Sequence, residues 1–534
     1  MMASKLISLR EAAKLIPDGA VVTVSSSSGV ACPDATLRSI GDHFRRTGSP
    51  RDLTAIHPIA AGDMYGIDGV NHLAQPGLLK RVIVGSLPSG TSSMESPPIW
   101  RMIINDEIEA YNLPSGVLYH MHREAAAGRP GLLTKVGWDT VVDPVHRGAK
   151  MNERDCADIV RRVEFDGEDW LYYKSIPIDV AIIRATTADE RGNLSMEHEG
   201  SYLGAVDQAL AAHNNGGIVI AQVKRMAQAG GLPAQSIRVP GTLVDYIVLD
   251  PDQLQASQTL YDPAISGEVA APLSEFEPVE WGVGKVIARR AAMTLLEGET
   301  VNLGFGISAL VPYIFLEEGL HGATTWVIEQ GAVGGLPLRD FAFGCASNPE
   351  AILPSPDQFT FFQGGGFDRS LLSFVEVNGA GSVNVSRLSA IPHITSGIGG
   401  FIDITTGARN IVFSGNFTAG GLQATVESGQ LQIQREGRFK KFVPEIEAQT
   451  FSGDMALKRG QTVMYITERC VMELDEKGLT ITEIAPGARL QEDVLDQAAI
   501  DLRVSPDLGQ MPAEIFQPEP MGLQLSAKAE AQCT

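Results

Sequence analysis

Hydrophobic positions along this chain follow two alternating patterns. Segments with apolar residues at spacings of three and four, typical of amphipathic helices, alternate with short β-branched runs bounded by glycine, typical of buried strands. Two such units begin at Arg10 and at Arg289. Each consists of a predicted helix, a turn at Gly19 or Gly298, a strand, a loop of small residues and a proline that opens the next helix. The pattern predicts mostly parallel sheets with helices on both faces.

The two units are similar in sequence as well as in pattern. Residues 10–37 and 289–316 align without gaps, and seven of the 28 positions are identical: Arg10, Ala12, Ala13, Gly19, Val22, Pro33 and Leu37 in the first copy. Later in each half, Gly192 aligns with Gly381 at a smaller offset, so the first half carries roughly ninety extra residues. We predict an α/β protein with two related, open, mostly parallel domains that arise from an internal repeat.

The boundaries of these domains are indicated by composition. A chain of 534 residues is too long for one ordinary core. Residues 262–278 are rich in Pro, Ala, Ser and Glu and show no strong period, which is typical of a linker. We predict an N-terminal domain over residues 1–275 with an insertion at about 90–175, a C-terminal domain over 280–515, and a flexible tail over 516–534.

Charge and cysteine content narrow the class of partners. The chain has 42 Lys and Arg against 64 Asp and Glu, a formal net charge of −22, which disfavours nucleic acid. No signal peptide and no apolar run of bilayer length is evident, so we expect a cytoplasmic protein with no membrane partner. The five cysteines lie far apart, as reduced thiols would, and the histidines form no metal-binding motif, so we expect no metal.

Two glycine-rich loops are candidates for ligand binding. The segment GFGIS, with Gly304 and Gly306, falls between a predicted strand and a helix, where free backbone N–H groups could hold an anion. The segment SGIGGFID, with Gly397, Gly399 and Gly400, would let a ligand approach the backbone closely and leave amides directed at an oxyanion. The chain contains no complete GxGxxG, Walker or GxSxG motif, which disfavours dinucleotide, nucleotide and serine-hydrolase sites.

One glutamate occurs where a charge is unusual. In WVIEQGAVGG, residues 326–335, an apolar pair runs into Glu329 and then into three glycines. We predict that Glu329 lies at the carboxyl end of a buried strand, where α/β proteins bind ligands, although an ordinary solvated loop carboxylate is the alternative. When TTWVIEQG is aligned with DLTAIHPI, residues 52–59, His57 occupies the position of Glu329 in the first half. This difference favours one active site shared across the interface between the halves.

Taken together, these segments resemble the family I CoA-transferases, and specifically the single-chain acyl-CoA:acetate/3-oxoacid type in which both subunits are fused. The resemblance is carried by EQGAVGG, FFQGGGFDRSLLSF, GSVNVS and SGIGGFIDI in the second half and by ADERGNLSMEHEGS and VPGTLVDYIV in the first. It implies that Glu329 is the nucleophile, with Gly399 and Gly400 as oxyanion-hole candidates. It further implies transfer of CoA between carboxylic acids through a glutamyl-CoA thioester, with CoA as substrate and covalent intermediate and no permanently bound cofactor.

The resemblance also suggests which residues contact the substrates. The candidates for binding the acyl group or CoA are Gly304, Gly306, Gly397, Asn384, Ser115, Ser28 and Gly29. Two departures from the family pattern, SSSSG at residues 25–29 and NLPSG in place of NLPQG, place hydroxyl groups near the expected acyl pocket. We therefore expect short to medium, polar acyl groups, with an acyl-CoA and a carboxylic acid of the acetate, propionate or 3-oxoacid class as partners. We also expect a homo-oligomer, a dimer or a tetramer.

Two alternatives belong to other functional classes. A sugar-phosphate isomerase would also use anion-binding loops and a carboxylate base, but it would not need two fused copies of the fold. A non-enzymatic effector-binding domain of a transcription regulator should carry a basic helix-turn-helix segment, and in so acidic a chain we expect no Lys/Arg cluster.

Overall fold

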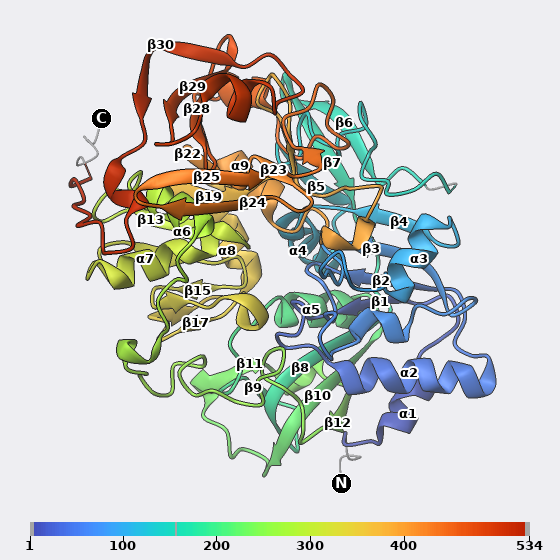
Figure 1. Ribbon diagram of the computed structural model, residues 1–534. Coiled ribbons are helices and arrows are strands. Elements are labelled where there is room, and N and C mark those ends of the chain that lie inside the picture. Colours follow the sequence, from blue (N-terminus) through green and yellow to red (C-terminus); the bar gives the residue numbers. More distant parts are fainter. Residues whose placement is uncertain (1–4, 155–156, 529–534) are drawn as a thin grey trace.

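A computed structural model describes residues 5–154 and 157–528 (Figure 1). The chain forms two large sheets, one from each half of the sequence. In Figure 1 the first half, coloured blue to green, occupies the right side and the bottom of the view, and the second half, coloured yellow-green to red, occupies the upper left. This arrangement confirms the predicted α/β class with mostly parallel sheets.

The first sheet is parallel through its centre. Its order is β12 (Tyr246–Leu249), β10 (Ile218–Ala227), β8 (Val180–Asp189), β1 (Val21–Val24), β2 (Leu53–His57), β3 (Leu79–Val84) and β4 (Glu109–Asn112). The short β9 (Leu194–Ser195) pairs antiparallel with β8, and β11 (Ile237–Val239) pairs antiparallel with β9. Its helices are α1 (Leu9–Lys14), α2 (Asp34–Thr47), α3 (Pro98–Ile104), α4 (Ser115–Ala126) and α5 (Ala205–Asn214). Strand β8 is buried along its whole length, as expected for a central parallel strand covered on both faces.

The second sheet has a parallel centre and antiparallel edges. Its order is β18 (Ala351–Ile352), β15 (Ala332–Val333), β14 (Thr325–Val327), β13 (Thr300–Leu303), β19 (Arg369–Ser373), β22 (Asn410–Ser414), β27 (Thr462–Ile466), β28 (Cys470–Asp475), β29 (Gly478–Ile484) and β30 (Arg503–Gln510). Its helices are α6 (Val283–Ala292), α7 (Val311–Glu317), α8 (Ser355–Gln363), α9 (Phe401–Gly407) and α10 (Gly453–Lys458). Strands β14, β13, β19, β22 and β27 are parallel, so their carboxyl ends meet at one edge.

Smaller sheets complete the fold. They are β5 (Gly131–Thr134) with β7 (Glu168–Lys174) and β6 (Val160–Phe165), β16 (Leu336–Pro337) with β17 (Ala346–Ser347), β20 (Glu376–Val377) with β21 (Val383–Asn384), β23 (Thr418–Ala419) with β26 (Phe439–Lys440), and β24 (Gln423–Glu427) with β25 (Gln430–Arg435). The first of these lies within the segment predicted as an insertion, together with α3, β4 and α4. Helix α4 packs against α8 and α9 of the second half, so the extra residues help to form the interface.

The internal repeat is visible in the strand order. The order β2-β1-β8-β10-β12 in the first sheet matches β14-β13-β19-β22-β27 in the second, with the same chain direction in every pair. In both sheets the first strand pairs on one side with the strand that follows it in sequence and on the other side with a later strand. A switch of this kind marks the edge where doubly wound sheets bind ligands.

The register of the strands corrects one detail of the sequence alignment. Ile56 and Val327 are equivalent, because they pair with matching positions of β1 and β13. His57 therefore corresponds to Ile328, and the counterpart of Glu329 is the residue after His57, so the predicted match between His57 and Glu329 was wrong by one position. The strands before His57 and Glu329 are apolar throughout and show no alternation of polar and apolar positions. Without such alternation, a shift of one residue in the alignment cannot be detected from sequence.

The predicted flexible tail is largely docked. The guanidinium of Arg289, which is fully buried, donates to two backbone carbonyls of residues 517–519, at 2.5 and 2.8 Å. The carboxylate of Glu318 accepts two backbone N–H groups of residues 521–523. A buried arginine needs acceptors, and this segment supplies them. These contacts attach residues 517–523 to the second half, residues 529–534 lie outside the described residues, and the flexibility of the tail stays a prediction.

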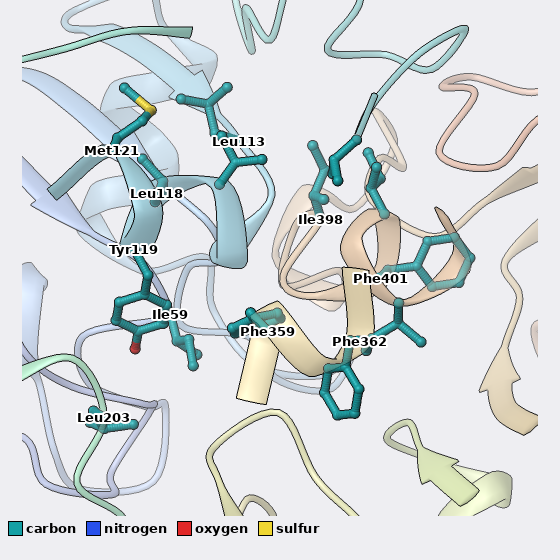
Figure 2. Packing of buried hydrophobic residues seen from close by; sticks show 14 of the residues in the cluster. Ile59, Leu113, Leu118, Tyr119, Met121, Leu203, Phe359, Phe362, Ile398 and Phe401 are labelled. Carbon is teal, nitrogen blue, oxygen red and sulfur yellow. The ribbon is translucent and has the colours of Figure 1, made fainter. Parts of the chain in front are cut away.

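The hydrophobic core extends across the boundary between the halves. Figure 2 shows Ile59 and Tyr119 of the first half beside Phe359 of the second, and Leu118 and Phe401 belong to the same cluster. The rings of Tyr119 and Phe359 are 6.0 Å apart between centroids. Within residues 5–154 and 157–528, none of the helices has the length and apolar character needed to cross a membrane.

Candidate active site

Glu329 lies where the sequence pattern predicted, directly beyond strand β14. The chain turns sharply there, because the N–H of Gly331 donates to the carbonyl of Ile328 at 2.9 Å. Gly331 has a φ of +114°, and a Cβ at this position would lie 1.9 Å from the carbonyl oxygen of Leu353. Only glycine fits such a turn, which explains why a glycine follows the strand so closely. The turn directs Glu329 towards the interface between the halves.

The carboxylate of Glu329 is held by one donor at each oxygen. The backbone N–H of Gly400 donates to Oε2 at 3.1 Å, and the side-chain amide of Gln330 donates to Oε1 at 3.2 Å. A Cβ on Gly400 would lie only 2.2 Å from Glu329 Oε2, so a glycine is required for this approach. The loop SGIGGFID and the carboxylate, predicted separately from sequence, are therefore in direct contact.

Burial changes the acidity of this carboxyl group. It raises the pKa of Glu329 to about 7, while the hydrogen bonds from Gly400 and Gln330 act in the opposite direction. The residue as a whole keeps partial solvent access although its carboxyl group lies deep in the protein. A carboxylate that is desolvated and still reachable suits a nucleophile, because it is not stabilised by bulk water.

The loop Gly397–Gly400 is fixed to the first half of the chain. The N–H of Gly399 donates to the carbonyl of Gly85 at 2.7 Å, and the carbonyl of Gly399 accepts the N–H of Ser115 at 2.9 Å. The N–H of Ile398 donates to Asn112 Oδ1 at 2.8 Å. Of the two predicted oxyanion donors, Gly399 is thus occupied, whereas the N–H of Gly400 faces Glu329.

A second link between the halves runs through Gln330. Its side-chain amide, which also contacts Glu329, donates to Ser27 Oγ at 3.1 Å. The sequence singled out Ser28 and Gly29 in this loop, but Ser28 is exposed, and Gly29 is buried where a Cβ would lie 2.2 Å from Ser257 Oγ. Ser27 makes the contact with the site, and nothing in the run of four serines distinguished it.

Ser115 is buried at the first residue of helix α4, close to the Gly397–Gly400 loop. Its hydroxyl has no hydrogen-bond partner in the described part of the chain, which is unusual for a buried polar atom. The next residue, Gly116, donates its N–H to Asp403 Oδ2 at 2.9 Å. The predicted substrate contact Ser115 therefore lies beside the site with a hydroxyl still available.

Asp403 is a residue of the site that sequence reasoning missed. It is fully buried in the first turn of helix α9, and besides Gly116 it accepts the amide of Gln363 at 2.8 Å. Burial raises the pKa of Asp403 to about 7, and the negative charge of Glu329 adds to the effect. Its position three residues after Gly400, one turn along α9, was the available signal.

The remaining predicted contacts fall into two groups. Gly304 and Gly306 lie at the carboxyl end of β13, the strand next to β14, and Phe305 between them is 64% exposed. Asn384, in contrast, is committed to its own loop: its amide donates to Glu376 Oε2 and to the carbonyl of Arg387, both at 2.7 Å. Asn384 thus stabilises a turn, and nothing places it against a substrate.

A cavity of about 230 Å³ lies between the halves but does not contain Glu329. Its lining includes Asn112 and Ile398, which anchor the Gly397–Gly400 loop. The desolvated carboxylate and the donors that converge on it meet at Glu329, outside this cavity. Among the described residues, no group of three His, Cys, Asp or Glu could hold a metal ion.

Known proteins that resemble this chain are CoA-transferases. Residues 6–250 match the family model described as coenzyme A transferase. The chain is 40% identical to the caffeate CoA-transferase of Acetobacterium woodii, over 96% of this chain and 97% of that one. It is also 40% identical to the acetate CoA-transferase YdiF of Escherichia coli (strain K12), over 98% of this chain and 97% of that protein.

The chain belongs to the family I CoA-transferases. The crystal structure of the acyl-CoA transferase YdiF apoenzyme from Escherichia coli O157:H7 superposes with a TM-score of 0.91 at 38% identity and covers 98% of both chains. A thioester complex of that transferase with CoA superposes with a TM-score of 0.90. The predicted family and its fused, single-chain form are confirmed.

This family assignment also settles the reaction class. The protein is a transferase that moves CoA between an acyl-CoA and a carboxylic acid, with CoA as substrate and as covalent thioester intermediate. This reaction class excludes the two alternatives, a sugar-phosphate isomerase and a non-enzymatic effector-binding domain.

Proposed function

We propose that Glu329 is the covalent nucleophile of a ping-pong reaction between a short-chain acyl-CoA and a carboxylic acid acceptor. The observation that carries this proposal is the desolvated carboxylate of Glu329 at the interface of the two halves, held by the N–H of Gly400 and the amide of Gln330. Burial keeps the carboxylate poorly solvated, which raises its nucleophilicity, and the two donors fix its orientation.

The reaction proceeds through two covalent states of Glu329. A carboxylate oxygen attacks the thioester carbonyl, the C–S bond breaks, and a mixed anhydride and CoA thiolate form. The thiolate then attacks the glutamyl carbonyl, the anhydride C–O bond breaks, and the acyl group leaves as a carboxylate. CoA remains on Glu329 as a thioester. The acceptor carboxylate attacks this thioester, and the same steps in reverse deliver the new acyl-CoA.

Gly400 stabilises these steps through its backbone N–H. The donor is already directed at Glu329 Oε2 before reaction, so it needs no reorganisation when charge develops on the glutamyl oxygen. Gly399 cannot serve equally, because its N–H is committed to Gly85. The oxyanion hole that we propose for the glutamyl carbon therefore contains Gly400, while Gly397 and Gly399 shape the loop.

The pH dependence of transfer should report the acidity of Glu329. Only the ionised carboxylate attacks, and its pKa is raised to about 7, so kcat/KM for acetyl-CoA should rise with pH up to about 7 and then level off. The measurement is kcat/KM between pH 5 and 8.5 at constant ionic strength. A profile that stays flat down to pH 5 would contradict a raised pKa and fit a glutamate of ordinary acidity.

The acyl group is proposed to be short to medium and polar. Ser27 is buried and hydrogen-bonded to Gln330, and Ser115, beside Gly399, has a buried hydroxyl without a partner among the described residues, so hydroxyl groups lie close to the Glu329 site. Two relatives of equal identity are named for acids that differ from each other in size and polarity, acetate and caffeate, so the acyl group must be determined for this protein. In a panel of acyl-CoA donors with acetate as acceptor, acetyl-CoA to butyryl-CoA and their hydroxylated forms should give the highest kcat/KM. Octanoyl-CoA as the best donor would contradict this.

The most direct test of transfer is isotope exchange. Labelled acetate and unlabelled acetyl-CoA should yield labelled acetyl-CoA only in the presence of the enzyme, and free CoA should not accumulate.

We further propose that residues 1–275 and 280–515 are the equivalents of two fused subunits, and that the protein is a cytoplasmic homo-oligomer. Sedimentation velocity analysis would detect the oligomer, and a sharp monomeric boundary at micromolar concentration would exclude it.

A further inference from the structure

A basic segment lies beside the second sheet in a chain with a formal net charge of −22. Residues 435–441, REGRFKK, contain four cations and a single acid, Glu436, which pairs with Arg469. The cations are Arg435, Arg438, Lys440 and Lys441. Within the described residues none of them pairs with a carboxylate, and the sequence analysis, which expected no such cluster, missed it. A group of cations without direct ion pairs, in an acidic protein, indicates a site for an anion.

Lys441 differs from the other cations of this segment. Those three are exposed and donate to backbone carbonyls, whereas Lys441 is half-buried and its ammonium makes no hydrogen bond within the described part of the chain. Its Nζ lies 3.8 Å from the centre of the Phe374 ring, and a Cβ on Gly415 would lie 3.0 Å from it. Burial lowers the pKa of Lys441 to about 8, while the negative charge of the buried Glu468 acts in the opposite direction, so the group is charged at neutral pH although no described residue accepts a hydrogen bond from it.

The strand order places Lys441 at the same edge of the sheet as Glu329. Phe374 directly follows β19 and Gly415 directly follows β22, while Glu329 follows β14. These strands are parallel members of one sheet in the order β14-β13-β19-β22. With neighbouring strands about 4.8 Å apart, the end of β22 lies roughly 14 Å from the end of β14 along this edge.

The surface between Glu329 and Lys441 is formed by small residues. Gly304 and Gly306 follow β13, and the hydroxyl of Ser373, at the end of β19, donates to the carbonyl of Phe305 at 2.8 Å. Gly306 has a φ of +92°, which favours glycine and leaves the backbone uncovered. A flexible, amide-containing chain could lie along this edge without meeting large side chains, apart from the exposed ring of Phe305.

CoA has the dimensions that this edge requires. Its pantetheine arm contains two amides and is about as long as four extended residues, roughly 14 Å. A CoA thioester on Glu329 would therefore bring the diphosphate to the end of β22. We propose that Lys441 binds the phosphate groups of CoA at this point, with the exposed Arg435 and Arg438 adding to the positive potential around the nucleotide. This inference rests on the proposed function, in which Glu329 carries CoA.

The test compares two acetyl donors that differ only in the nucleotide. Lys441→Met keeps the side chain's apolar stem over Phe374 and removes the charge, so kcat/KM for acetyl-CoA should fall about 10- to 100-fold, as for loss of one charge-assisted hydrogen bond. With acetyl-pantetheine, which has no phosphate, kcat/KM should not change. Lys441→Arg should restore most of the activity towards acetyl-CoA. Lys477→Met, at an exposed hairpin tip, is the matched control.

Each outcome bears on the inference. An equal loss with both donors would show that Lys441 acts through folding or through the chemical step, and would overturn it. Unchanged kcat/KM with acetyl-CoA would overturn it as well. Activity towards acetyl-pantetheine also serves as the check that the Lys441→Met protein is folded. If the unmodified enzyme showed no CoA transfer with any acyl-CoA, the proposed function itself would be wrong. That result differs from a loss that is seen only in the Lys441→Met protein.

Discussion

Replacing Glu329 by alanine should abolish CoA transfer and leave the protein folded. Without the carboxylate neither the anhydride nor the thioester can form, so kcat should fall by at least about 10³-fold, as for other covalent nucleophiles. The fold should tolerate the change, because burial raises the pKa of this group and the ionised form therefore costs folding free energy in this position. Label exchange between acetate and acetyl-CoA gives the activity, and the thermal midpoint gives the stability.

Two further variants make this result specific. Glu350→Ala removes another glutamate, whose side chain lies against Gly334 of the same glycine-rich stretch, and should keep near-normal transfer. Glu329→Gln keeps the size of the side chain and its hydrogen-bonding capacity and should start inactive. Slow deamidation could restore its carboxylate, so it must be assayed fresh. Near-normal exchange by Glu329→Ala would return Glu329 to the status of an ordinary loop carboxylate.

Gly400→Ala should be the most damaging change outside the nucleophile. The added Cβ would lie 2.2 Å from Glu329 Oε2 and 2.7 Å from the ring of Phe359, so the carboxylate or the loop must move. Displacing the N–H of Gly400 from the glutamyl oxygen should lower kcat by about 10²-fold or more, as for loss of an oxyanion donor. The pKa of Glu329 should also rise further, because that N–H lowers it.

The matched control is Gly284→Ala. This glycine lies in helix α6, and a Cβ there would meet a single atom, of Leu310, at an ordinary 3.9 Å. Alanine in a helix is favourable by up to about 1 kcal/mol relative to glycine, so this variant should be active and at least as stable as the unmodified protein. Equal kcat for the Gly400→Ala and Gly284→Ala proteins would contradict the assigned role of Gly400.

Most of the fold could be predicted from local patterns. The repeat of strand, loop and helix at Arg10 and Arg289 specified two related parallel sheets, because parallel strands need helical crossovers and a buried apolar run. Glu329 was identifiable for the same reason: a charge directly after a buried strand, followed by glycines, has few structural explanations. The adjacent segment SGIGGFID was identifiable because its glycines allow close approach.

Contacts between distant segments could not be predicted in this way. The link from Gln330 to Ser27 and the pairing of Asp403 with Gly116 both depend on how the two halves dock. The docked tail shows the same limit: its composition indicates flexibility, but the buried Arg289 binds its carbonyls. The composition of a segment indicates its own structural preference, whereas these contacts depend on the residues of other segments that pack against it.

The central claim, that Glu329 carries CoA as a thioester, can be tested by trapping that state. The enzyme is incubated with acetyl-CoA in the absence of an acceptor, reduced with borohydride and digested. The account predicts inactivation, and it predicts that mass spectrometry will find the reduced residue in the peptide containing VIEQGAVGG, at Glu329. The Glu329→Ala protein should give no modified peptide. A CoA adduct or a reduced residue at any other position, or full activity after this treatment, would contradict the account.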